Sequence, residues 1–222
     1  MPTAVCLLSG GMDSTTAAYV ARDMGYAICG LHVSYGQLTE TKERECARII
    51  AEKLGAVDYV EITLEHLLRF GKSSLTDRSL TVGDHDGNAE GIPATYVPFR
   101  NANLLSIATS YAEASGAGAI FIGVQASDYA GYPDCRPEFV EAFQRVIDTG
   151  TADDTRIRLM SPFVHMNKTA IIRRGLALGV PYGNTWSCYR SNAPACGKCD
   201  SCYYRLQAFR EAGVPDPIEY GD

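Results

Sequence analysis

The fold of this chain is decided by Thr3-Ala4-Val5-Cys6-Leu7-Leu8-Ser9-Gly10-Gly11-Met12-Asp13-Ser14. The apolar run from Thr3 to Leu8 predicts a buried strand, and residues 9–14 connect it to a helix. Glycines at such a junction let several backbone N–H groups face one point, and the helix N-terminus adds positive potential. The stretch therefore predicts a phosphate-binding loop, with a plain glycine turn capped by Asp13 as the alternative.

The residues that follow alternate between helical and strand patterns. Helices are predicted at Ser14–Met24 and Glu40–Leu54, and strands at Tyr26–Val33 and Val57–Thr63. This β-α-β-α-β order is typical of an α/β fold with ligands at the carboxyl ends of the strands. We therefore expect a doubly wound parallel sheet with helices on both faces.

The second half continues the pattern after a long loop rich in Gly, Asp, Asn and Pro at residues 72–95. Further elements are predicted at Asn101–Ser115, Ala119–Gly123, Pro137–Asp148, Asn167–Leu178 and Cys202–Ala212. From Trp186 onward, cysteines and small residues replace the hydrophobic patterns typical of strands and helices. We expect an α/β domain over residues 1–185 and a small C-terminal metal-binding segment over residues 186–222.

Bulk composition favours a soluble protein that acts on a small molecule. The 222 residues are 46% hydrophobic, and 26 acidic residues against 20 basic ones give a net charge of −6. An acidic chain without a Lys/Arg-rich block disfavours nucleic acid as a stable partner. No apolar run approaches the roughly 18 to 20 residues that span a bilayer, and no signal peptide precedes the first strand. We expect a cytoplasmic protein without membrane contact.

Four of the eight cysteines lie close together, at Cys188, Cys196, Cys199 and Cys202. Closely spaced thiolates around a glycine suit a tetrahedral Zn²⁺ site, which leaves no open ligand position and therefore has a structural role. An iron–sulfur cluster is the first alternative, because C-x2-C-x2-C also occurs in ferredoxin-type ligand sets. Thiols without metal are the second alternative.

A polar loop, residues 123–139, leaves a buried strand and enters a helix. An α/β fold places its specificity residues in such loops. Acidic groups there suit the N1–H and amine of a guanine-like ring, aromatic rings can stack on it, and an arginine can pair with a carboxylate. We expect Tyr132, Asp134 and Arg136 to contact the substrate. For each of them a role in the loop alone is the alternative.

The glycine loop resembles the Ser-Gly-Gly-x-Asp-Ser signature of the PP-loop ATP pyrophosphatases. Members of that superfamily cleave ATP between its α- and β-phosphates and leave an adenylate on the substrate. The resemblance implies an adenine nucleotide alpha hydrolase-like fold and ATP chemistry. The substrate remains open, because the superfamily makes amides, thiolates transfer RNA and builds lysidine.

Further blocks resemble the 7-cyano-7-deazaguanine synthases of queuosine biosynthesis. These blocks are Gly131-Tyr132-Pro133-Asp134-Cys135-Arg136, Val97-Pro98-Phe99-Arg100-Asn101, Ser187-Cys188-Tyr189 and Ala195-Cys196-Gly197-Lys198-Cys199-Asp200-Ser201-Cys202. They follow the family's order over nearly the whole chain. The chain departs from the family at Phe99, where a glycine is common, and at Leu38-Thr39, where Arg-His is common.

The resemblance implies an enzyme that converts 7-carboxy-7-deazaguanine and ammonia to the nitrile with ATP, through an adenylated carboxylate and an amide. It implies Mg²⁺ and Zn²⁺ as cofactors, the four cysteines as zinc ligands and a homodimer. The implied ATP site comprises Leu8, Ser9, Gly10, Gly11, Met12, Asp13, Ser14, Thr15, Thr16, Ala17 and Ala18. Catalytic roles are expected for Asp13, Ser14 and Lys168, while Arg100 and Asp128 are expected to assist phosphate or Mg²⁺.

Three alternatives stay open from the sequence. A related enzyme would stop at the amide, and a transfer-RNA thiolation ATPase of the same superfamily would bind RNA. A zinc-stabilised nucleotide-binding module would bind ATP without turnover.

Overall fold

The computed structural model describes residues 1–87, 91–125 and 131–221. Its strands are β1 (Thr3–Leu7), β2 (Ala27–Ser34), β3 (Asp58–Thr63), β4 (Ala119–Phe121) and β5 (Arg158–Met160). Its α-helices are α1 (Met12–Asp23), α2 (Glu40–Leu54), α3 (Glu65–Phe70), α4 (Arg100–Ser115), α5 (Pro137–Gly150), α6 (Lys168–Ala177) and α7 (Asp200–Ala212). Two 3-10 turns, η2 (Pro133–Cys135) and η3 (Tyr182–Asn184), complete the elements of the described residues.

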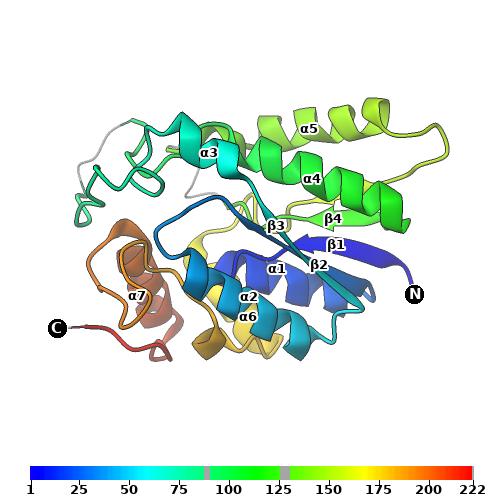
Figure 1. Cartoon of the computed structure of the whole chain (residues 1–222). Coiled ribbons are helices and arrows are strands. Elements are labelled where there is room, and N and C mark those ends of the chain that lie inside the picture. The colour runs from blue at the N-terminus through cyan, green and yellow to red at the C-terminus, as the bar shows by residue number, and fades with distance from the viewer. Residues whose placement is uncertain (88–90, 126–130, 222) are drawn as a thin grey trace.

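The strands form one parallel sheet in the order β3-β2-β1-β4-β5. Helices α1, α2 and α6 cover one face, and α4 and α5 cover the other (Figure 1). The order changes direction between β1 and β4, which is where sheets of this kind bind ligands. The predicted doubly wound α/β fold is confirmed.

Both faces of the sheet are apolar, as strands buried between two helical layers require. Cys6 and Phe121 face α1 and α6, whereas Val5 and Ile120 face α4 and α5. A third apolar cluster forms where the C-terminal segment meets the end of β2, and it includes Tyr35, Trp186 and the buried cysteines of that segment. This third cluster connects the cysteine-rich end of the chain to the carboxyl edge of the sheet.

Most predicted elements are present, with shifted ends. Helix α1 begins at Met12 instead of Ser14, and the last helix begins at Asp200 instead of Cys202. The side chain of Asn167 caps α6 by accepting a hydrogen bond from the Ala170 N–H. Helix α3 and strand β5 were not predicted. They span six and three residues, which is too short for a hydrophobic period to stand out.

Among the described residues, no helix is both long enough and apolar enough to cross a membrane.

Candidate nucleotide and metal sites

The glycine loop connects the end of β1 to α1 and is held closed by its two serines. The Ser14 hydroxyl lies 2.9 Å from the Ser9 hydroxyl, accepts a hydrogen bond from the Ser9 N–H and donates one to the Gly11 carbonyl. No side chain among the described residues caps the N-terminus of α1. The plain turn capped by Asp13 is therefore not what the chain forms, and the N–H groups of the first helical turn stay available to an anion.

Gly10 adopts a φ of +81°, in the left-handed region that favours glycine. A Cβ at this position would lie only 2.3 Å from the Glu43 carbonyl oxygen of α2. The Gly10 carbonyl in turn accepts a hydrogen bond of 2.8 Å from the Trp186 N–H. The loop is thus wedged between α2 and the start of the C-terminal segment, which fixes its shape before any ligand binds.

Gly123 follows β4 and packs directly under the first turn of α1. A Cβ at this position would lie 2.7 Å from the Ser14 nitrogen and 2.8 Å from the Asp13 carbonyl carbon. The sequence places Gly123 at the start of a polar loop and gives no sign of this contact. Because β1 and β4 are neighbours in the sheet, only the tertiary structure brings Gly123 to the glycine loop.

We expect Gly123→Ala to lower the free energy of unfolding by about 1 to 3 kcal/mol, because the added methyl group overpacks a contact with the backbone. It should also displace the glycine loop and lower any activity that depends on it. Urea unfolding measures the first effect. Gly118→Ala is the matched control, since a Cβ there meets no atom within 4 Å. Equal stability of the two variants would contradict the prediction.

A cavity of about 240 Å³ opens at the carboxyl edge of the sheet, beside the glycine loop. Six of the residues predicted to bind ATP line it: Leu8, Ser9, Gly11, Met12, Asp13 and Ser14. The other five do not line it. Gly10 packs on α2, Thr16 hydrogen-bonds Met12 and Tyr182, and Ala17 and Ala18 lie in the core with buried Thr15.

Lys168 begins α6 and reaches the same cavity from a distant part of the chain. Its ammonium group forms an ion pair of 3.2 Å with Asp13 Oδ2. The other carboxylate oxygen, Asp13 Oδ1, is buried without a hydrogen-bond partner in the described part of the chain. The structure therefore brings Asp13, Ser14 and Lys168 together on one cavity, and their catalytic roles stay predictions.

Arg100 lines the cavity from the N-terminus of α4, on the opposite face of the sheet from α1. It donates hydrogen bonds to the Tyr35 hydroxyl at 3.0 Å and, more weakly, to Asn101 Oδ1 at 3.5 Å. Asp128, predicted to act with Arg100, lies outside the described residues.

The residues predicted to contact substrate lie beside the cavity but do not belong to its described lining. The Asp134 carboxylate is buried and accepts the Asn101 N–H at 2.8 Å, so it caps α4. The Tyr132 hydroxyl lies 2.7 Å from the Thr95 hydroxyl, and Arg136 is exposed. Their contact with substrate stays a prediction. Cys135, between them, does reach the cavity wall.

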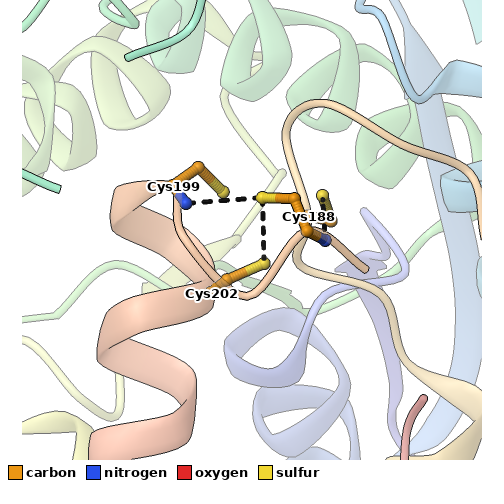
Figure 2. Close-up of side chains that lie close together, drawn as sticks. Cys188, Cys199 and Cys202 are labelled. Carbon is orange, nitrogen blue, oxygen red and sulfur yellow. Dashed lines mark hydrogen bonds between the residues drawn. The ribbon is translucent and has the colours of Figure 1, made fainter. Parts of the chain in front are cut away.

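The four clustered cysteines converge at the start of α7. Their sulfur atoms all lie within 4.8 Å of one another, and Figure 2 shows Cys188, Cys199 and Cys202 turned toward a common point. Cys188 accepts hydrogen bonds from the N–H groups of Arg190, Ser191 and Cys196. Hydrogen bonds from the Cys199 and Cys202 thiols lower the pKa of Cys188, and the surrounding amides lower it further. The group can therefore hold a metal ion.

An interaction that the sequence did not suggest anchors the cysteine-rich C-terminal segment to the α/β domain. Arg205 of α7 is completely buried and binds both carboxylate oxygens of Asp216, at 2.7 and 2.9 Å. It also donates to the Thr185 hydroxyl and the Tyr182 carbonyl. Arg205 thus joins both sides of the boundary expected at residue 185.

Part of the long loop, at Asp84 and His85, contacts the C-terminal segment. The His85 ring nitrogen Nδ1 lies 2.7 Å from Asp200 Oδ1, and the ring stacks on Tyr203 with centroids 3.7 Å apart. The backbone N–H of His85 donates a hydrogen bond to the Lys198 carbonyl. Arg190 pairs with Asp84 at 2.6 Å. These described residues of the loop therefore pack on the cysteine-rich C-terminal segment.

Comparison with known proteins identifies relatives over almost the full length. Residues 3–213 match the family described as queuosine biosynthesis protein QueC. The chain is 66% identical over 220 residues to the 7-cyano-7-deazaguanine synthase of Methanoculleus marisnigri, covering 99% of each. It is 61% identical over 217 residues to the 7-cyano-7-deazaguanine synthase of Methanospirillum hungatei JF-1, covering 98% of this chain and 99% of the relative. The resemblance stated from the sequence is confirmed.

A solved structure shares the fold. NMN synthetase from Francisella tularensis superposes with a TM-score of 0.54, covering 96% of this chain and 78% of its own, at 17% identity. At that level of identity the likeness concerns the fold alone.

Proposed function

Because the chain belongs to the queuosine biosynthesis protein QueC family, we propose that it converts 7-carboxy-7-deazaguanine and ammonia to 7-cyano-7-deazaguanine with ATP. The observation that supports this most is the N-terminus of α1, which no side chain of the described residues caps. It faces a cavity at the carboxyl edge of the sheet that Asp13, Ser14 and Lys168 also line. The names of these relatives supply the product, 7-cyano-7-deazaguanine, while the acid and ammonia as substrates are part of the proposal. The reaction has two stages, each of which consumes one ATP.

In the first stage a carboxylate oxygen attacks the α-phosphorus of ATP. An oxygen–phosphorus bond forms, and the bond from the α-phosphorus to the pyrophosphate oxygen breaks. The N–H groups at the start of α1 and the Lys168 ammonium stabilise the negative charge on the departing pyrophosphate. Ammonia then attacks the carbonyl carbon and displaces AMP, which gives the amide.

In the second stage the amide oxygen attacks the α-phosphorus of another ATP. Loss of AMP and of the two protons on the amide nitrogen leaves the nitrile. The same anion-binding groups serve both stages, because both cleave the same bond in ATP. Ser14 contributes by closing the loop through its contacts with Ser9 and Gly11.

Mg²⁺ fits the Asp13 side of the cavity. Asp13 offers a buried oxygen without a hydrogen-bond partner among the described residues, beside the loop that would hold the phosphates. Carboxylate oxygens are ligands that Mg²⁺ prefers. When bound, the ion would neutralise charge on the phosphates during cleavage.

Zn²⁺ fits the cysteine cluster. Tetrahedral ligands at a Zn–S distance of about 2.3 Å lie about 3.8 Å apart, and the sulfur atoms of Cys196 and Cys202 are 4.0 Å apart. Four thiolates fill the coordination sphere, so the ion would stabilise the fold and take no part in the reaction.

We expect the purified protein to contain one zinc per chain by elemental analysis. Cys202→Ser should lose the metal and lower the melting temperature, whereas Cys6→Ser should retain it, because Cys6 is a buried cysteine outside the cluster. Iron together with acid-labile sulfide would point to a cluster instead. A purified protein without bound metal, whose stability Cys202→Ser leaves unchanged, would contradict both the zinc site and the iron–sulfur cluster.

The central test incubates the protein with 7-carboxy-7-deazaguanine, ammonia and Mg·ATP and follows the products by mass spectrometry. We expect the nitrile, AMP and pyrophosphate, with two AMP formed for each nitrile. Amide that accumulates without nitrile would identify an enzyme that stops at the first stage. ADP as the only nucleotide product would refute adenylation, and ATP binding without turnover would indicate a binding module.

A further inference from the structure

Arg100 is a cation on the wall of the cavity, and the buried Asp134 carboxylate acts on it from beyond ion-pair distance. Two of its guanidinium nitrogens bind the neutral groups of Tyr35 and Asn101, and its Nε is buried without a hydrogen-bond partner in the described structure. Among the described residues, no carboxylate forms an ion pair with it within 4.0 Å. A partly buried charge without a close ion-pair partner is costly, so a site that keeps one is suited to an anion that arrives with the ligand.

The other charged side chains of the cavity lining already have partners. Lys168 is paired with Asp13. The Glu43 carboxylate accepts hydrogen bonds from Gln37 and Thr39, at 3.0 and 2.7 Å. Arg100 is therefore the group of the described lining with the greatest capacity to bind an incoming anion.

The surroundings of Arg100 suit a flat organic acid better than a phosphate chain. Leu104 lies one helical turn further along α4, on the same side of the helix, and it lines the cavity with Ile122 and Val124. The glycine loop and Lys168, which are suited to phosphates, come from α1 and α6 on the other face of the sheet. The cavity thus has an anion-binding end beside α1 and a second cationic point beside an apolar wall.

We propose that Arg100 binds the carboxylate of the acid substrate in the first stage and has no equivalent partner in the second. This inference rests on the proposed function. The guanidinium holds one carboxylate oxygen while the other attacks the α-phosphorus. The acyl adenylate that results has lost the carboxylate charge, and the amide that enters the second stage is neutral. Arg100 therefore distinguishes the two substrates of one active site.

The test compares Arg100→Gln with the wild type on two substrates, the acid and the amide, each at saturating ATP. We expect the KM for the acid to rise about 10- to 100-fold, as for the loss of a hydrogen-bonded charged partner. The KM for the amide and the KM for ATP should stay within about threefold. Arg100→Lys, which keeps the charge but loses the planar fork, should recover part of the acid affinity.

Titration calorimetry without ATP provides a second measurement. Wild type should bind the acid more tightly than the amide, and Arg100→Gln should remove that difference. An equal loss on acid and amide, or a rise in the KM for ATP alone, would overturn the inference and assign Arg100 to the phosphates. Preferential binding of the acid by a wild type that shows no turnover would refute the proposed function while supporting the carboxylate site.

Discussion

Asp216→Asn is expected to lower the free energy of unfolding by about 3 to 5 kcal/mol, the usual cost of leaving a buried charge without its partner. Arg205 is completely buried, and Asp216 supplies both oxygens that neutralise it. The same carboxylate also accepts hydrogen bonds from the Tyr220 hydroxyl and the Ile218 N–H. The substitution therefore weakens the attachment of the C-terminal segment at several points.

Asp84→Asn is the matched control for this effect. It also removes one carboxylate from an arginine pair, but the Asp84 side chain is 69% exposed. Exposed pairs contribute about 0 to 1 kcal/mol, because water screens them. Chemical unfolding of both variants measures the difference. Similar losses from the two substitutions would show that Asp216 does not have the structural role assigned to it.

Lys168→Met is expected to lower kcat by about 10²- to 10³-fold, the range seen when one preorganised group that stabilises developing charge is removed. The substitution keeps most of the unbranched side chain and removes the ammonium group that faces the cavity beside Asp13. Both ATP-dependent stages should slow together, because both release pyrophosphate. AMP formation with the acid and with the amide measures the two stages separately.

Lys53→Met in the last turn of α2 is the control for this variant, since Lys53 is exposed and does not line the cavity. It should leave both rates unchanged. A Lys168→Met protein that folds normally and retains full activity would remove Lys168 from the pyrophosphate site. A loss confined to the acid would assign Lys168 to the carboxylate and would weaken the inference drawn for Arg100.

Local patterns in the chain predicted the elements whose signals are local. The apolar run at residues 3–8, the helical pattern at residues 167–178 and the alternation of strands and helices each depend on neighbouring residues. Their order then restricts the topology, because parallel strands need helical crossovers of one hand. The clustered cysteines were also recognisable, since all four ligands lie within fifteen residues of chain.

The features that the sequence did not predict depend on contacts between distant segments of the chain. Gly123 lies 109 residues after Ser14 in the chain and touches its backbone, and Trp186 binds Gly10. In the sequence, Arg205 is indistinguishable from any other helical arginine. Only the structure shows that it binds Asp216 and the Tyr182 carbonyl. Single residues of common types carry no sign of such partners, because the contact is created by folding.

The sequence by itself determined a parallel α/β sheet with a phosphate-type loop after the first strand and a four-cysteine cluster near the end. It could do so because backbone geometry, hydrophobic period and ligand spacing act over short distances. Only the tertiary structure decided which side chains share the cavity: Asp13 is paired with Lys168, and Arg100 has no carboxylate within ion-pair distance among the described residues. Whether a charge is paired depends on distances across the fold, and those are fixed only when the strands and helices pack together.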